Sequence, residues 1–263
     1  MAARNVIWKP TVDRLEAVGG GPEGSRGFLE IGSPPLGIAM LRDDHFIGDT
    51  LDANVYQYAN NGTAAADPAV SAGALNGVIL LNPGTDADGY SALSMGRHCR
   101  GDHNATIWWR VSMNPTAMTS TKFELGFTDV VAGTDAGAVN VKATPTFRAD
   151  DCVCWVYDTN DDQLLTLVGN KATVAATPID VTAATFTPVI NGVYWFGITL
   201  KGDRAKGFIL DANTKLIAET AWMEDAVTES VLLTPWAFAQ NRAASQRYLV
   251  VDRLKVYQRE STG

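Results

Sequence analysis

Alternating side chains fill Tyr248-Leu-Val-Val-Asp-Arg-Leu-Lys-Val-Tyr-Gln258, close to the end of the 263-residue chain. Successive side chains of a β-strand point to opposite faces. One face is therefore expected to carry Asp252 among four apolar residues, namely Tyr248, Val250, Leu254 and Val256. The opposite face would carry Leu249, Val251, Arg253, Lys255 and Tyr257. The run predicts a long strand that closes a β-sheet.

The chain before this strand consists of short apolar runs separated by turn residues. The run 106–113 ends at Asn114-Pro115, and the run 152–157 ends in Asp158-Thr-Asn-Asp-Asp162. Gly202-Asp203 suits a tight turn between strands over 193–200 and 205–210, with Tyr194, Phe196, Ile198 and Leu200 on one face. A helix is expected only over 221–231. This spacing predicts an all-β protein built as an antiparallel β-sandwich.

The first 40 residues differ in composition from the remainder. Val18-Gly-Gly-Gly-Pro-Glu-Gly-Ser-Arg-Gly27 is rich in glycine, and Ser33-Pro-Pro-Leu-Gly37 cannot lie inside a sheet. We expect residues 1–40 to form an extended N-terminal arm that docks on the sandwich or on a neighbouring subunit. Residues 41–263 are expected to form one sandwich domain, a size that β-sandwiches commonly reach.

The order of these elements resembles the C-terminal half of the concanavalin A-like lectin/glucanase superfamily. That order is a tryptophan-bearing strand, a Gly-Asp turn, a strand ending in Asp-Ala-Asn, and the closing Val-Asp-Arg-Leu-Lys-Val-Tyr-Gln strand. The closing strand is similar to the Val-Asp-Tyr-Val-Arg-Val-Tyr pattern of laminarinase-like members. Asp43-Asp-His-Phe-Ile-Gly-Asp-Thr-Leu-Asp52 with Tyr56 resembles the opening of such domains in tailed-bacteriophage virion proteins. The resemblance covers residues 41–258 and implies a jelly-roll sandwich.

The sequence argues against an enzyme. Laminarinase-like members need a Glu-x-Asp-x-x-Glu strand, whose two glutamates act as nucleophile and general acid about 5 Å apart. The partial matches 219–224 and 224–229 place alanine where the aspartate should be, and Glu124 and Asp129 have the wrong spacing. The chain has no Gly-x-Ser-x-Gly elbow and no complete phosphate-binding loop. We therefore predict no catalytic residues.

Few residues suggest a ligand. Trp108 and Trp109 point to opposite faces of one strand, where an exposed ring could stack on a sugar, although burial on both faces of a sandwich explains them without any ligand. Asp86 and Asp88, with Gly89 and Thr134-Asp135, offer oxygen ligands for Ca²⁺, although such residues more often bond their own turn. Asp252 is expected to play a structural role, held by backbone N–H groups, a hydroxyl or a basic side chain.

Other ligands and partners are disfavoured. His98, Cys99 and His103 make a poor zinc site, and Cys152 and Cys154 are expected to be buried thiols. The net charge of −8 and the lack of a basic run argue against nucleic acid. The N-terminus lacks an apolar stretch of signal-peptide length, and no apolar run is long enough to insert into a membrane.

These observations support three hypotheses. The first is a non-enzymatic virion structural protein of a tailed phage, made in the host cytoplasm without a signal peptide. It would form a symmetric homo-oligomer on the capsid or tail, contact major capsid or tail proteins, and stabilise the particle or attach it to a host-surface glycan. The second is a carbohydrate-binding module for a surface polysaccharide, and the third is a divergent glycan hydrolase.

Overall fold

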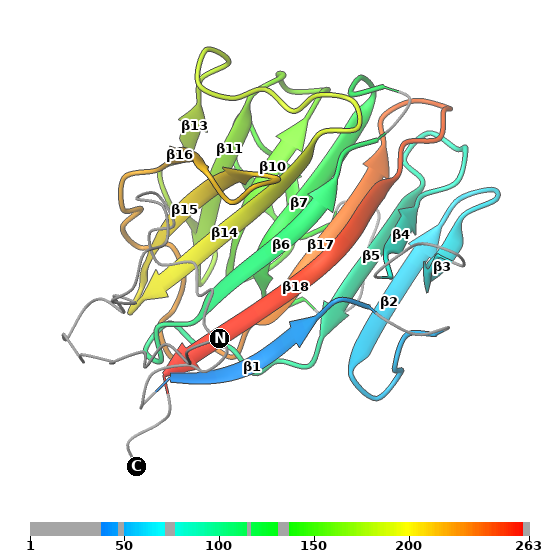
Figure 1. Cartoon of the computed structure of the whole chain (residues 1–263). Helices are drawn as coiled ribbons and strands as arrows, with labels where there is room; N and C mark the ends of the chain where they lie inside the picture. The colour runs from blue at the N-terminus through cyan, green and yellow to red at the C-terminus, as the bar shows by residue number, and fades with distance from the viewer. Residues whose placement is uncertain (1–37, 47–49, 72–76, 115–116, 131–136, 260–263) are drawn as a thin grey trace, which may run out of the picture.

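The computed structural model describes residues 38–46, 50–71, 77–114, 117–130 and 137–259. These residues form two eight-stranded antiparallel sheets packed face to face, together with a two-stranded hairpin (Figure 1). The all-β class and the antiparallel sandwich predicted from the sequence are confirmed. Of the predicted arm, only residues 38–40 are described, and they belong to the first strand.

The sheet that faces the viewer in Figure 1 is called the β18 sheet after its longest strand. In spatial order it contains β16 (Leu216–Glu219), β15 (Arg204–Asp211), β14 (Val193–Lys201), β6 (Thr106–Ser112), β18 (Leu249–Arg259), β4 (Ile79–Asn82) and β3 (Ala66–Val70), while β1 (Ile38–Asp44) also pairs with β18.

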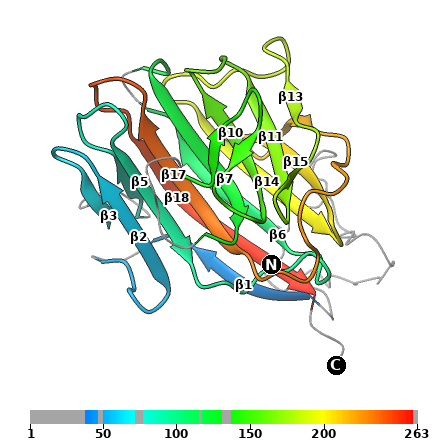
Figure 2. The same ribbon diagram turned by 180° about the vertical axis from the view of Figure 1, so that it is seen from behind.

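The second sheet is called the β7 sheet and is seen from its own side in Figure 2. In spatial order it contains β12 (Val174–Ala175), β11 (Leu165–Lys171), β10 (Cys152–Asp158), β7 (Thr121–Thr128), β17 (Thr234–Asn241), β5 (Tyr90–Met95) and β2 (Tyr56–Asn61), while β13 (Ile179–Val181) pairs with β11. The hairpin consists of β8 (Val139–Val141) and β9 (Thr146–Phe147).

The main hydrophobic core lies between the two sheets. It is built from alternate residues of the central strands, including Ile107 and Trp109 of β6, Leu125 of β7 and Trp155 of β10. The indole N–H of Trp155 donates to the carbonyl of Gly197 at 3.0 Å, so this large ring is buried without an unmet donor. The predicted hairpin is also present, because Lys201 pairs with Arg204 across Gly202-Asp203.

A β-bulge in β18 changes the alternation predicted for the closing strand. The register shifts between Val251 and Arg253, so Asp252 is the extra residue of the bulge. The core face consequently carries Leu249, Val251, Leu254 and Val256. The prediction that Asp252 shares a buried face with Leu254 and Val256 is wrong, because strict alternation does not continue through a bulge.

The helix predicted over 221–231 is also wrong, and the described residues contain no α-helix. The backbone there bonds to the start of β15 instead. Met223 and Ala205 exchange both backbone hydrogen bonds, at 2.8 and 3.0 Å, and the N–H groups of Ala226 and Val227 donate to the carbonyl of Asp203. In the described ranges, no helix has the length and apolar character needed to cross a membrane.

Candidate functional site

Glu124 lies in the middle of the outer face of the β7 sheet, and its side chain is fully buried. Its Oε2 accepts hydrogen bonds from the backbone N–H of Ala138 and the indole N–H of Trp236, both at 2.8 Å. Its Oε1 accepts the N–H of Val139 at 3.2 Å and lies 2.8 Å from the ammonium of Lys122. A buried carboxylate is costly unless it is paired and bonded, and this one has four donors.

A row of aromatic rings lies beside this carboxylate on the same face. Phe238 of β17 stacks between Trp236 of β17 and Tyr90 of β5, with both ring-centroid distances 5.9 Å and interplanar angles of 13° and 22°. Lys122 places its ammonium 5.6 Å from the centroid of the Phe238 ring, a cation–π contact. The carboxylate, the ammonium and the three rings therefore form one polar and aromatic cluster.

Residues 137–149, called the strap below, cover this cluster and include the β8–β9 hairpin. Gly137 begins the strap with φ of +69°, and a Cβ there would lie 2.6 Å from Glu124 Oε1. Only glycine allows the backbone to approach the carboxylate this closely. Ala138, Val139 and Ala149 then pack on the outer face with Trp236 and Phe238.

The turn of the β8–β9 hairpin is fixed at the turn between β10 and β11. Asp161 Oδ2 accepts the backbone N–H groups of Lys142 and Ala143 at 2.7 and 3.2 Å. The buried ammonium of Lys142 pairs with Asp162 and donates to the carbonyl of Leu164 at 2.7 Å. Close to where the strap ends, the Asn170 amide donates to the carbonyl of Ala149 at 2.8 Å.

The cluster contains a single carboxylate, that of Glu124. Glycoside hydrolysis uses two carboxyl groups across the scissile bond. Along the outward side of β7, Glu124 is accompanied by Lys122 and Thr128, which are not carboxylates. Asp129 follows the strand, and burial raises the pKa of its carboxyl, with Asp150 and Asp151 adding to the effect.

The structure places the two predicted sugar-contact tryptophans on opposite faces of β6, as expected from alternation. Trp109 is 1% exposed within the core between the sheets, so its ring is not presented at the surface. Trp108 belongs to a cluster with Trp195 and Tyr257 on the outer face of the β18 sheet, and its ring centroid is 5.8 Å from that of Phe208. Neither tryptophan lies in the aromatic row.

The two predicted metal ligands lie in the loop between β4 and β5. Asp86 Oδ2 accepts the backbone N–H of Thr63 at 2.7 Å, while Asp88 is exposed, with its Oδ1 3.7 Å from Arg242. Residues 134–135, also considered as ligands, lie outside the described residues. Within the described ranges, no group of three or more His, Cys, Asp or Glu side chains could hold a metal ion. Cys99, Cys152 and Cys154 are buried free thiols.

Asp252 has a basic partner, because its carboxylate forms an ion pair with Arg110 of the neighbouring strand β6. The bulge directs this side chain to the outer side of the sheet, where 15% of it remains exposed.

The glutamates of the partial catalytic matches are dispersed and exposed. Glu219 ends the edge strand β16 and lies 3.2 Å from Lys206, while Glu224 lies 3.7 Å from Arg204.

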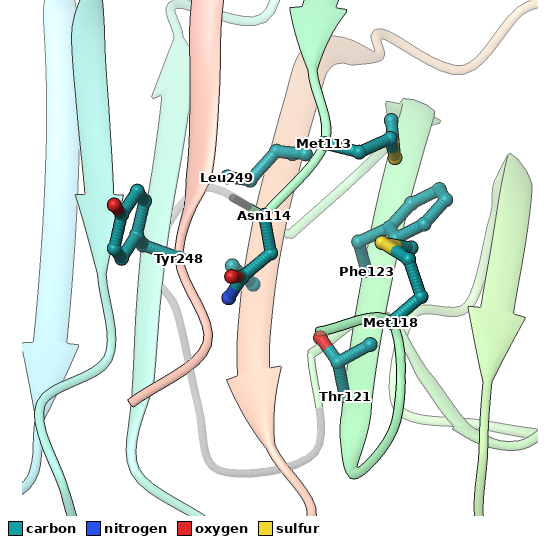
Figure 3. A pocket seen from close by; sticks show the side chains of 8 residues that line it. Met113, Asn114, Met118, Thr121, Phe123, Tyr248 and Leu249 are labelled. Atoms are coloured by element: carbon teal, nitrogen blue, oxygen red, sulfur yellow. The ribbon is translucent and has the colours of Figure 1, made fainter. Parts of the chain in front are cut away.

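One small pocket opens at the end of the sandwich where β6, β7, β17 and β18 converge (Figure 3). Its lining residues are Met113, Asn114, Met118, Thr121, Phe123, Ala239, Tyr248 and Leu249. The volume of about 10 Å³ suits a single water molecule and not a sugar ring.

Sequence reasoning considered Glu124 only for its spacing to Asp129 and missed its pairing with Lys122. The signal was present, because Lys122 and Glu124 stand two apart in an otherwise apolar strand and must share a face. Trp236 and Phe238 show the same period on β17. The strap gives no comparable signal, because its path depends on contacts with residues distant in sequence.

Comparison with known proteins supports the fold through structure alone. No family model matches the chain, and no curated protein matches its sequence. The CBM2 module of the evolved Dit protein of Lactobacillus casei BL23 phage J-1 is similar with a TM-score of 0.53 and 12% identity, covering 86% of this chain and 98% of the module.

Two further solved structures are similar. The Bacillus licheniformis β-glucanase has a TM-score of 0.54 and 10% identity, over 83% of this chain and 98% of the enzyme. Peanut lectin has a TM-score of 0.53 and 8% identity, over 84% of this chain and 97% of the lectin. Lectin and glucanase thus share one arrangement of strands with the two sheets described above. The chain has the concanavalin A-like sandwich fold.

Proposed function

We propose that this chain is a non-enzymatic, glycan-binding structural module of a tailed-phage particle. The observation that carries the proposal is the cluster on the β7 sheet, where Glu124 is surrounded by N–H donors and stacked rings. A carboxylate that accepts several hydrogen bonds is a hydrogen-bond acceptor of the kind that holds hydroxyl groups once donors are exchanged, and it is poorly suited to act as a nucleophile or general acid. The cluster therefore supports binding over hydrolysis.

The phage context rests on two further observations. The opening segment 43–52 resembles that of phage virion proteins, and the similar phage J-1 structure is a CBM2 module of a Dit protein. In such a particle the module would be displayed in several symmetric copies, which strengthens weak attachment to a polysaccharide through multivalency.

The test measures binding and hydrolysis on the same material. Insoluble mannan, β-1,3-glucan and galactan are incubated with the purified chain, and retention is measured together with the release of reducing sugar. We expect retention on at least one polysaccharide without sugar release. Sugar release that is lost in the Glu124→Gln variant would replace the proposal with the hydrolase hypothesis. Mass spectrometry of purified source particles tests the virion assignment, which absence of the chain would contradict.

A further inference from the structure

The strap is attached to the β7 sheet in an unusual way. In the described part of the chain, the bonds from backbone to backbone of residues 138–148 stay within the strap: β8 pairs with β9, and Arg148 N–H donates to the Ala138 carbonyl at 3.0 Å. The strands of the sheet, by contrast, are joined by continuous ladders, such as the eight registered pairs between β7 and β17. The strap can therefore leave the sheet without breaking a ladder.

Side chains of the sheet and of the turn between β10 and β11 bond the strap at three positions, the last being the bond from Asn170 to the carbonyl of Ala149. At the first, the carboxylate of Glu124 accepts the N–H groups of Ala138 and Val139, and the Lys122 ammonium donates to the carbonyl of Val139. At the second, Asp161 binds the N–H groups of Lys142 and Ala143. The strap also buries Ala138, Val139 and Ala149, but an element joined to a sheet by side-chain bonds and packing without a ladder opens locally at a lower free energy than the sheet beneath it.

The first contact leaves a stable arrangement on the sheet when it opens. Glu124 keeps the Lys122 ammonium at 2.8 Å and the Trp236 indole N–H at 2.8 Å, so the carboxylate remains paired. Departure of the strap frees the positions taken by two N–H donors, one on each carboxylate oxygen. It also uncovers the row of Tyr90, Phe238 and Trp236.

The donors of the strap have the pattern of a sugar diol. Two adjacent N–H groups approach the two oxygens of one carboxylate, as two adjacent hydroxyl groups of a saccharide would. The neighbouring stacked rings offer the flat apolar surface that suits the C–H face of a pyranose. The strap, which is part of the same chain, thus makes the hydrogen bonds to Glu124 and the contacts with the rings that a ligand would make.

We infer that the strap, residues 137–149, is a self-occupying cover over a binding site for a neutral saccharide with a vicinal diol, and that this ligand binds by displacing it. The inference rests on the proposed glycan-binding function and adds the location and control of the site. Because only the open fraction binds, the measured affinity is reduced by that fraction, and a variant that loosens the strap binds more tightly.

The test uses Asp161→Ala, which removes the acceptor of two N–H bonds at the second position, weakens the contact there although the Lys142–Asp162 pair remains, and leaves Glu124 and the aromatic row intact. Its matched control is Asp211→Ala, because Asp211 also accepts two backbone N–H groups, those of Asn213 and Lys215 at 2.8 and 2.9 Å, in a turn of the other sheet. Amide hydrogen exchange at Ala138 and Val139 reports strap opening, and retention on mannan, β-1,3-glucan and galactan reports binding.

In the wild type we expect these two amides to exchange faster than the ladder amides of β7. In Asp161→Ala we expect both their exchange rate and the affinity for the bound polysaccharide to rise about tenfold together, as a tenfold larger open fraction requires. Asp211→Ala should change neither the exchange rate nor the affinity.

Exchange of the strap amides only with global unfolding, or equal affinity of Asp161→Ala and wild type, overturns this inference and leaves the proposed function standing. If neither the wild type nor any variant, including Asp161→Ala, binds any of the polysaccharides, both this inference and the proposed glycan-binding function are overturned.

Discussion

Two acidic side chains lie on the outer faces of the two sheets and have very different surroundings. Glu124 lies on the middle strand of the β7 sheet, is fully buried and has four donors. Asp252 lies on the central strand β18 of the other sheet, remains partly exposed and pairs with Arg110. The comparison teaches that the cover, and not the position in the sheet, decides whether a carboxylate becomes part of a buried network.

The outer faces around these residues differ accordingly. Around Asp252 the charged side chains form pairs near solvent, such as Arg253, which donates twice to Asp43 at 2.7 and 2.8 Å. Around Glu124 the charges lie under the strap among aromatic rings. Exposed ion pairs contribute little to stability, whereas breaking a buried pair is costly.

The largest expected effect is that of Glu124→Ala, which leaves the buried Lys122 ammonium without its counter-charge. We expect a loss of about 3–5 kcal/mol in the free energy of unfolding, measured by chemical denaturation. Glu219→Ala is the control, because Glu219 pairs with Lys206 at an exposed edge strand and should cost about 1 kcal/mol or less. An equal loss of unfolding free energy in the two variants would show that a carboxylate beneath the strap contributes no more than an exposed one.

Gly137→Ala tests the approach of the strap to Glu124. The substitution adds the strain of a positive φ and a Cβ 2.6 Å from the carboxylate, so we expect a loss of about 2–4 kcal/mol in unfolding free energy. Gly202→Ala is a matched control, since Gly202 has a similar φ of +64° and the nearest atom to its Cβ would be 3.5 Å away. The control should cost only about 1–2 kcal/mol, the strain of the backbone alone. A control that costs as much as Gly137→Ala would show that contact with Glu124 contributes nothing.

Much of the fold was predictable from the sequence, because alternation and turn residues are local signals. The hairpin around Gly202-Asp203 follows from its turn chemistry, and the inward faces of β6 and β14 follow from their period. The failures have physical causes. The bulge at Asp252 depends on the register with β6, and residues 221–231 bond to β15 rather than to themselves.

The candidate site was less predictable than the fold. The shared face of Lys122 and Glu124 was readable from their spacing, but their burial was not. Burial depends on a strap whose anchors, Asp161 and Asn170, follow it in sequence and belong to or adjoin other strands. Such contacts have no periodic signal, so the site emerges only once the sheets are assembled.

Asp252→Ala provides the next smaller effect and tests the exposed member of the comparison. Its pair with Arg110 lies on a bulge with solvent access, and Arg110 can be hydrated when the carboxylate is removed. We expect a loss of about 1 kcal/mol or less in unfolding free energy, decreasing further in 1 M salt. A loss of 3 kcal/mol or more that salt does not reduce would assign Asp252 to a buried network like that of Glu124.

Added chelator should leave the melting temperature of wild type and of Asp252→Ala unchanged. Destabilisation of the wild type alone by chelator would make Asp252 a metal ligand.

The smallest effect concerns the pH dependence contributed by Asp43 on the same face. Burial acts to raise the pKa of this carboxyl, but the hydrogen bonds from Arg253 and the nearby charge of Lys255 outweigh burial, and the net pKa is lowered. A carboxyl with a pKa below its value of about 3.9 in the unfolded chain contributes stability above that pH. The contribution is lost as the pH falls through the folded-state pKa. The difference in melting temperature between wild type and Asp43→Asn should therefore be constant from about pH 5 to 7 and should narrow below about pH 4. A difference that persists unchanged at pH 2.5 would mean that Asp43 acts through shape and not through charge, and the contrast between the two faces would then not be electrostatic at this position.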